Sequence, residues 1–159
     1  MKTILLLAFL LSGLYAQEIN LPLELNAWKN LSYVNAAKNS EGVSNAILEV
    51  GKASYIGLNN TPKMKYVLRP MNEGGSVSYG GIFEVQIKES GTYRVALGNA
   101  SWIDMVKDAT AAKSIAHNEG AQNSGIRKMV DYNLEVGTYV LQLSAGADST
   151  TAILVTKIK

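Results

Sequence analysis

The chain has 159 residues, no cysteine, and 15 lysine and arginine side chains against 13 aspartate and glutamate side chains, a net charge of +2. Without cysteine it cannot form disulfides, thiolate metal sites or a cysteine nucleophile. The near balance of charge, with no cluster of lysine or arginine, excludes nucleic acid as an expected partner. We therefore expect a fold that is held together by packing alone.

Residues 1–16 have the pattern of a secretory signal peptide. Lys2 supplies a positive charge, residues 4–11 form an almost unbroken apolar run, and Ala16 precedes a polar stretch. The apolar run is shorter than the roughly 20 residues that a transmembrane helix needs, and no longer run follows it. We predict a cut after Ala16, a periplasmic or secreted protein, and one domain over residues 17–159 with no transmembrane segment.

Most of the chain beyond this segment has the pattern of β-strands. Residues 23–37 are ambiguous, because Leu25, Trp28 and Leu31 have helical spacing while the asparagines around them favour irregular chain. Further along, apolar residues recur at every second position in short runs separated by glycine and polar turns. Besides the two repeated segments described next, strands are expected at residues 46–50, 54–58, 65–69, 102–106 and 152–158.

Two segments repeat one pattern, and each predicts a hairpin. Apolar residues alternate with polar ones over residues 83–87 and again over residues 130–136. The matching corners Gly91-Thr92-Tyr93 and Gly137-Thr138-Tyr139 follow, and we expect both tyrosines to be buried with their hydroxyls on backbone carbonyls. Two such hairpins in facing sheets predict an all-β, antiparallel β-sandwich, jelly-roll-like, with about eight or nine strands.

The remaining glycine-rich and polar stretches predict loops. These stretches are residues 59–62, 70–75, 80–81 and 108–125. Gly80 and Gly81 are interpreted as turn or bulge glycines, since no phosphate-binding Walker or dinucleotide motif is present. A serine hydrolase is disfavoured as well, because the Gly-x-Ser-x-Gly motif is missing.

Trp102 and Asp104 are the first candidate site residues, since they share one face of a predicted strand. This pair forms either a ligand-binding patch or a structural acid, and we favour a bidentate ion pair between Asp104 and Arg127. Trp28 and Tyr79 offer a further alternative, because exposed aromatic rings can stack on sugars. The core is the more common place for such residues, and we favour it here.

His117 and Glu119 are the weak candidates for a metal site. In an extended chain, two residues at this spacing point to the same side, which allows zinc or copper to bind. A single histidine in a polar loop is more often an ordinary exposed residue, and structural or catalytic metal sites need more ligands. We therefore expect no cofactor, and we keep His117, Glu119, Arg127, Trp102 and Asp104 as speculative ligand-binding residues.

Several motifs in the second half of the chain follow one another in a recognisable order. They are Tyr79-Gly80-Gly81-Ile82, Gly91-Thr92-Tyr93-Arg94-Val95, Ser101-Trp102-Ile103-Asp104, Gly125-Ile126-Arg127-Lys128 and Gly137-Thr138-Tyr139. In these motifs the chain resembles a family of small exported bacterial proteins that often carry the label homogentisate dioxygenase. In that family, the loop before the Gly-Ile-Arg-Lys stretch carries two histidines one residue apart and then a cysteine. Here these places hold His117, Glu119 and Asn123.

The dioxygenase label implies ferrous iron held by two histidines and one carboxylate. The chain contains one histidine, so a single subunit cannot supply this ligand set. We therefore interpret the label as mistaken and expect an exported, non-catalytic binding or accessory β-sandwich protein with an unknown ligand or protein partner. It is similar to accessory domains of secreted enzymes. The alternatives are a metal-dependent enzyme that uses His117, and a structural protein that assembles by pairing its sheet edges.

Overall fold

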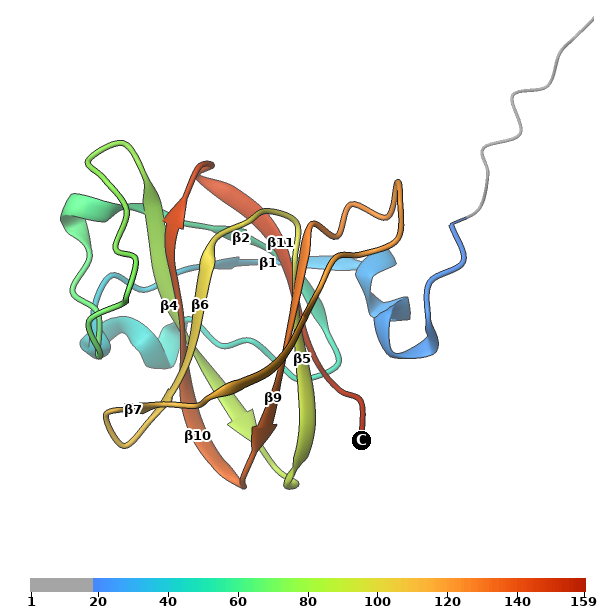
Figure 1. Cartoon of the computed structure of the whole chain (residues 1–159). Helices are drawn as coiled ribbons and strands as arrows, with labels where there is room; N and C mark the ends of the chain where they lie inside the picture. The colour runs from blue at the N-terminus through green and yellow to red at the C-terminus, as the bar shows by residue number, and fades with distance from the viewer. Residues whose placement is uncertain (1–18) are drawn as a thin grey trace, which may run out of the picture.

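The computed structural model describes residues 19–159, which form two facing β-sheets (Figure 1). The predicted signal peptide, residues 1–16, lies outside the described residues. The six-stranded sheet has the order β1-β2-β11-β5-β9-β8, with β1 Leu31–Asn35, β2 Ala53–Gly57, β5 Gly91–Leu97, β8 Ser114–Asn118, β9 Lys128–Leu134 and β11 Thr150–Lys157. The five-stranded sheet has the order β3-β4-β10-β6-β7, with β3 Asn59–Asn60, β4 Tyr79–Ile87, β6 Trp102–Lys107, β7 Thr110–Ala111 and β10 Gly137–Gly146. The 3-10 helices are η1 Leu23–Lys29, η2 Ser40–Asn45 and η3 Thr61–Lys63.

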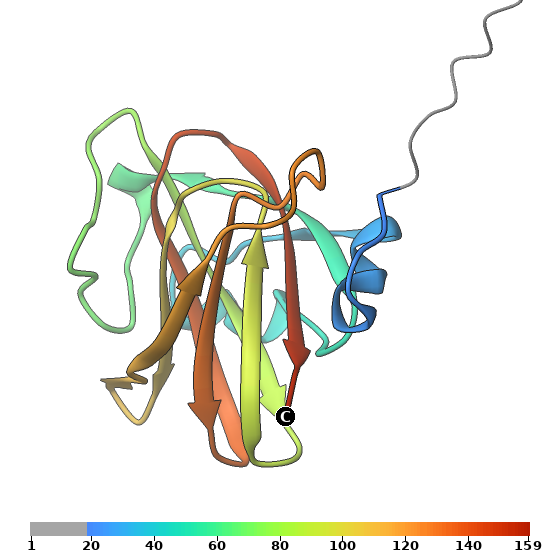
Figure 2. The same ribbon diagram turned by 45° about the vertical axis from the view of Figure 1, so that its right-hand side comes forward.

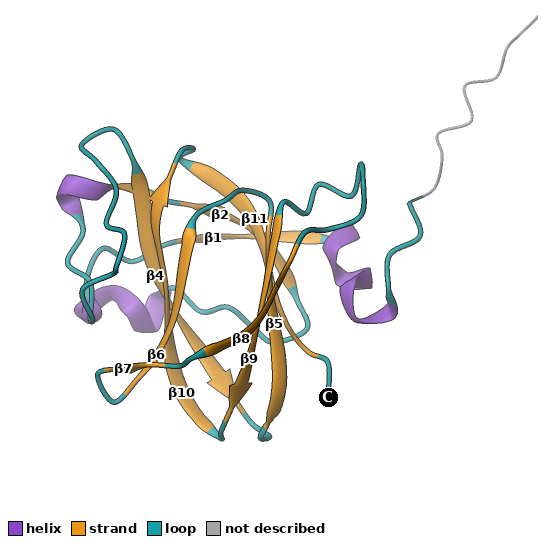
Figure 3. Cartoon of the chain, in the orientation of Figure 1, coloured by secondary structure: helices purple, strands orange, loops and turns teal. Residues whose placement is uncertain are grey.

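The prediction of an all-β sandwich is confirmed. Figure 3 shows that strands dominate the described chain, with short helices at its periphery. There are more strands than the predicted number of about eight or nine, partly because β3 and β7, of two residues each, add to the five-stranded sheet. Most pairs are antiparallel, whereas β1 and β2 run parallel. Within residues 19–159, none of the helices has the length and apolar character that crossing a membrane requires.

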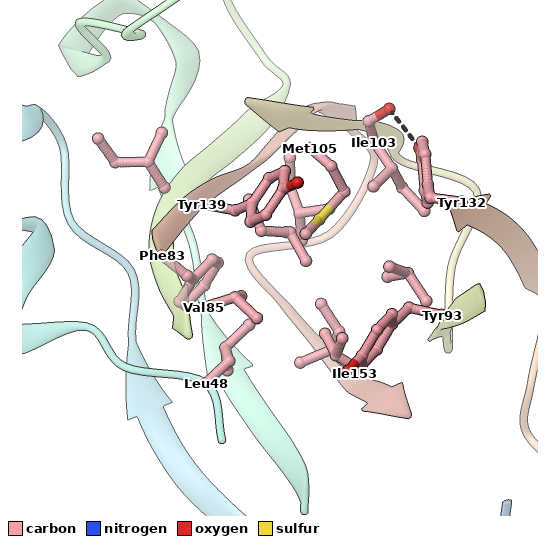
Figure 4. Packing of buried hydrophobic residues seen from close by; sticks show 14 of the residues in the cluster. Leu48, Phe83, Val85, Tyr93, Ile103, Met105, Tyr132, Tyr139 and Ile153 are labelled. Atoms are coloured by element: carbon pink, nitrogen blue, oxygen red, sulfur yellow. Dashed lines mark hydrogen bonds between the residues drawn. The ribbon is translucent and has the colours of Figure 1, made fainter. Parts of the chain in front are cut away.

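The alternating apolar residues of both repeated segments fill the space between the sheets. Phe83, Val85 and Ile87 of β4 are fully buried, as is Leu141 of β10 beside them. Figure 4 shows several of these side chains packed together, with the hydroxyl of Tyr132 reaching the backbone of β6. The period-two pattern therefore predicted correctly which side chains form the core.

The prediction of two hairpins is wrong, because each segment crosses from one sheet to the other. β4 lies in the five-stranded sheet and β5 in the six-stranded sheet, while the next segment crosses back from β9 to β10. The two segments pair with each other, β4 with β10 and β5 with β9. Their turns touch where Ser90 donates a hydrogen bond to Glu135 over 2.8 Å. Val136 lies in one of these turns and is 53% exposed, contrary to its place in the predicted pattern.

The two corner tyrosines are buried, as predicted. Tyr93 donates its hydroxyl to the carbonyl of Glu89 over 2.6 Å. Tyr139 differs, since its hydroxyl accepts a hydrogen bond from the backbone N–H of Glu135 over 3.1 Å. Each tyrosine thus binds the backbone four residues before it, on the other side of the turn that changes sheets. These bonds fix the two crossings.

Some predicted strands are confirmed and others are not. β2, β6 and β11 match the strands expected at residues 54–58, 102–106 and 152–158. Residues 46–50 form no strand: a single bridge pairs Ile47 with Glu84, while the side chains of Ala46 and Leu48 pack into the core. The ambiguous segment forms η1 and then β1, and the long stretch expected as a loop contains β7 and β8.

Residues 65–69 were also expected as a strand, but they belong to a long connection that lies on the outer face of the five-stranded sheet. Gln142, which is 1% exposed, holds this connection by accepting hydrogen bonds from the backbone N–H groups of Val67 (2.8 Å) and Leu68 (3.0 Å). Because the backbone of this segment binds a side chain, no strand forms there. We call residues 61–78 the covering loop.

Gly80 and Gly81 lie inside β4 and not in a turn. They face an irregularity of β10, where the pairing slips between Leu143 and Gly146. A Cβ atom at Gly80 would overlap the hydroxyl of Tyr66, which donates to the carbonyl of Leu143 over 3.1 Å. The absence of a side chain at this position therefore lets the covering loop approach the sheet.

The outer face of the six-stranded sheet is covered by the N-terminal segment. Leu25 and Trp28 of η1 pack with Ala53, Leu154 and other residues in a second apolar cluster, separate from the main core. Figure 2 shows η1 beside this sheet, away from the five-stranded one. Trp28 is 9% exposed, so its core interpretation is confirmed.

Candidate functional site

The candidate site lies where β6 of one sheet faces β8 and β9 of the other. β7 pairs with β6 at Val106 and Lys107 and leaves the edge of β6 uncovered along residues 102–104. From β7 the chain then runs to β8 in the opposite sheet (Figure 3). Two adjoining pockets follow this edge, and both are lined by His117 and Lys128.

The five residues selected from the sequence all line these two pockets. The first, which we call the indole pocket, has a volume of about 310 Å³ and is lined by Trp102, Asp104 and His117. The second, the arginine pocket, has a volume of about 390 Å³ and is lined by His117, Glu119 and Arg127. Together they form one cleft that neither sheet could build alone.

Trp102 and Asp104 lie on the same face of β6, as predicted. The indole N–H of Trp102 donates to a carboxylate oxygen of Asp104 over 3.0 Å. Burial raises the pKa of Asp104, and the hydrogen bond from Trp102 opposes this shift in part. The pair therefore presents an apolar ring and a partly desolvated carboxylate to the indole pocket.

Lys128 is a functional candidate that the sequence reasoning missed. Its ammonium group donates to the carbonyl of Ser101 over 2.9 Å and lies 5.8 Å from the centre of the Trp102 ring. Burial lowers the pKa of Lys128, because the charged form is partly desolvated. The pattern did contain a clue, since Lys128 is in phase with Val130 and Tyr132, which face the core.

Tyr132 forms part of the floor of the indole pocket. Its buried hydroxyl donates to the carbonyl of Ile103 over 3.1 Å and ties β9 to the uncovered edge of β6. Burial, together with the charge of Asp104, raises the pKa of this phenol. Tyr132 is thus a neutral hydrogen-bond donor that positions the two sheets around the pocket.

The predicted ion pair between Asp104 and Arg127 is wrong. Arg127 binds Glu119 over 2.7 Å, and both side chains are mostly exposed. Arg127 directly precedes Lys128, the first residue of β9, so the two side chains point to opposite faces of that strand. The bidentate pair of the fold joins Arg94 to Asp131, with both bonds at 2.8 Å.

Within residues 19–159, the side chain of His117 makes one hydrogen bond, in which its Nε2 atom lies 3.0 Å from the hydroxyl oxygen of Ser114. This is the distance of a nucleophile and its base. A working pair also needs a group that orients the imidazole, and within residues 19–159 no carboxylate is hydrogen-bonded to His117. The contact is exposed and spans an irregularity in the pairing of β8 with β9.

The metal candidates do not build a site within the described chain. Over residues 19–159, no three histidine, aspartate or glutamate side chains gather closely enough to bind an ion. Glu119 is engaged by Arg127. The residues therefore do not fit the iron that the dioxygenase label implies.

A further hollow lies elsewhere and is a weaker candidate. It has a volume of about 410 Å³ and is lined by Leu48, Tyr93 and Lys157, among others. Two of its charged groups are already paired, since Lys157 binds Glu89 over 2.7 Å. Size does not set this hollow apart from the pockets of the cleft, whereas the grouping of chemically active side chains favours the cleft.

Comparison of the chain with protein-family models and with curated proteins finds no match.

Proposed function

We propose that this chain is an exported, non-catalytic binding module that holds a small ligand in the cleft between β6 and the β8–β9 pair. The main observation in support is that Trp102, Asp104 and Lys128 converge there from two sheets, with an indole face, a carboxylate and an ammonium group in one pocket. A concave site with apolar walls and a few converging polar groups is the usual form of a ligand pocket.

The chemistry of the cleft supports binding over catalysis. Within the described residues, the side chain of His117 forms a hydrogen bond with Ser114 and with no carboxylate. The pair therefore has no acid that orients the imidazole. Asp104 accepts the indole N–H of Trp102 and has no second carboxylate beside it in the indole pocket. Acid–base catalysis by two carboxylates needs such a partner.

The export of the module is proposed from the signal-peptide pattern of residues 1–16. Its membership in the family of small exported proteins is proposed from the ordered motifs between Tyr79 and Tyr139. Neither proposal depends on the family's dioxygenase label, whose iron ligands the single His117 does not supply.

The binding function is tested by NMR titration of the isotopically labelled protein with a library of small neutral, anionic and cationic polar compounds. We expect binders to shift the indole N–H signal of Trp102 and the amide signals of β6, β8 and β9. Trp102→Leu should remove these shifts, whereas Val136→Ala, in an exposed turn, should keep them. Shifts confined to the hollow around Leu48, or turnover that is lost in His117→Ala, would contradict the proposal.

A second candidate function is assembly through the edge of the six-stranded sheet. Leu31 and Tyr33 of the edge strand β1 are 46% and 60% exposed. An exposed apolar edge strand is a surface that can pair with another strand. Sedimentation velocity over a concentration series tests this: self-association that Tyr33→Lys abolishes supports assembly, and a monomer at all concentrations excludes it.

A further inference from the structure

We infer that the cleft binds a small carboxylic acid that also carries hydroxyl groups, such as a sugar acid. This inference rests on the proposed binding function and specifies its ligand class. The structure supplies three features that select such a ligand. They are a cation without a carboxylate partner, a carboxylate that can accept hydrogen bonds from hydroxyl groups, and an apolar ring between them.

The cation is Lys128. The ion pairs among residues 19–159 do not include it, and its one hydrogen bond goes to the neutral carbonyl of Ser101. An ammonium group has three donors, so two remain for a ligand. Burial lowers the pKa of Lys128, and none of the ion pairs within the described residues gives it a carboxylate that would compensate the lost hydration. A ligand carboxylate would supply that compensation.

The other charged groups of the cleft also favour a negatively charged ligand. Arg127 and Glu119 neutralise each other at the rim. Lys113 also lines the indole pocket, where Asp104 is the single acidic residue. The indole pocket therefore carries a positive balance, which attracts an anion and disfavours a cation.

Asp104 defines the rest of the ligand. One of its oxygens accepts the indole N–H of Trp102, and a carboxylate can accept further hydrogen bonds. A second anionic group near Asp104 would be repelled, whereas a hydroxyl group would donate to it. The ring of Trp102 offers an apolar surface for the C–H groups of a sugar ring. The pocket volume of about 310 Å³ is at the lower end of the usual range for ligand pockets, which indicates a small ligand.

The test compares D-glucuronate with neutral D-glucose and cationic D-glucosamine by NMR titration and calorimetry. We expect glucuronate to bind at least about tenfold more tightly than glucose, because a hydrogen bond between an ammonium group and a carboxylate is stronger than one to a neutral hydroxyl group. Lys128→Met should remove this preference and Lys128→Arg should retain it. Raising the salt concentration should weaken glucuronate binding more than glucose binding.

Lys107→Met is the matched control. The ammonium group of Lys107 also lies over an aromatic ring, 5.6 Å from the centre of Tyr139, and donates to a carbonyl, that of Val136, over 2.9 Å. The same substitution there removes the same kind of contacts outside the cleft. It should leave glucuronate binding unchanged, which separates the ligand role of Lys128 from its packing.

The outcomes distinguish the ligand class from the binding function. Equal affinities for glucose and glucuronate, or tighter binding of glucosamine, would overturn the acidic ligand while leaving a binding cleft. Preference for glucuronate that survives in Lys128→Met would overturn the assignment of Lys128. If no compound of any charge, in this set or in the wider library, shifts the signal of Trp102, both the inference and the proposed function fail.

Discussion

The two outer faces of the sandwich are covered by different physical means. On the six-stranded sheet, η1 buries Leu25 and Trp28 in an apolar cluster. On the five-stranded sheet, the covering loop is held by hydrogen bonds to Gln142 and Ser144, whose hydroxyl donates to the carbonyl of Asn72 over 2.7 Å. Apolar contact is non-directional and cumulative, whereas a few hydrogen bonds fix position with little net stabilisation.

This difference bears on the candidate site, because the cleft borders the outer face of the five-stranded sheet, where hydrogen bonds hold the covering loop. Asp104 is paired with Gln142 in the sheet, and Met71 of the covering loop lines the indole pocket. A cover with few apolar contacts opens at a lower free energy than a packed one. We therefore expect η1 to determine the stability of the domain and the covering loop to determine access to the cleft.

Trp28→Ala should give the largest loss of stability. It removes the largest side chain of the η1 cluster, and substitutions of this kind cost about 3 kcal/mol or more. Chemical denaturation by urea measures the change in the free energy of unfolding. Leu23→Ala in the same helix is the control, since Leu23 is 85% exposed and its loss should cost under about 0.5 kcal/mol. Similar losses in the two variants would contradict a packed cover.

Asp131→Asn should be the next most damaging change. Asp131 and Arg94 lie under η1, with side chains 7% and 16% exposed, and Glu24 of η1 lies 3.5 Å from Arg94. The hydrogen bonds that Arg94 donates to the Asp131 carboxylate raise the pKa of Arg94, and removing that carboxylate leaves a poorly hydrated cation. We expect a loss of about 2 kcal/mol in urea denaturation.

The control for the buried pair is Glu119→Gln, which breaks the pair with Arg127 at the rim of the cleft. Those side chains are 77% and 59% exposed, so the loss should be under about 1 kcal/mol. An equal loss in the two variants would show that burial does not distinguish the two ion pairs.

Gln142→Met should have a smaller, local effect. The substitution keeps the length of the side chain and removes its bonds to Val67 and Leu68, including the bond that its amide donates to the carbonyl of Leu68 over 2.8 Å. We expect a global loss of about 1 kcal/mol and faster hydrogen exchange at the amides of Val67 and Leu68. Gln86→Met is the control, because Gln86 is exposed and binds Thr138 instead. Unchanged exchange in the covering loop would mean that other contacts hold it.

The sequence predicted which side chains face the core but not which strands pair. An inward-facing strand has the same alternating pattern in either sheet, so residues 83–97 fit a hairpin as well as a crossing. The decision depends on contacts far apart in the sequence, such as Ser90 with Glu135. The prediction of a strand at residues 65–69 is wrong for the same reason. The side chain of Gln142, which binds the backbone of the covering loop, is more than seventy residues away in the sequence.

At the candidate site too, the sequence predicted the local relations but not the contacts between distant segments. The spacing of Trp102 and Asp104 predicted their common face, because the relation is local. The predicted pairing of Asp104 with Arg127 joins two distant segments, and it is wrong because Arg127 is out of phase with the indole pocket, which Asp104 lines. Lys128 is the residue in phase with the indole pocket. The alternation of Val130, Tyr132 and Leu134, extended by two residues toward the N-terminus, identifies it.

Tyr66 provides the mildest test of the covering loop, since its titration perturbs the loop by a change of pH. Its hydroxyl donates to the carbonyl of Leu143 over 3.1 Å. Burial, with smaller effects from Glu73 and Asp104, raises the pKa of Tyr66 to about 12, against about 10 for an unfolded tyrosine. The raised pKa means that the folded state favours the neutral phenol. Its contribution to stability is therefore complete below about pH 10 and is lost as the pH rises from 10 through 12. Ultraviolet titration of the protein and of Tyr66→Phe should differ by one phenol with a midpoint near 12. A difference centred near pH 10 would mean that the loop leaves Tyr66 in water, and the cover of this face would then be open in solution.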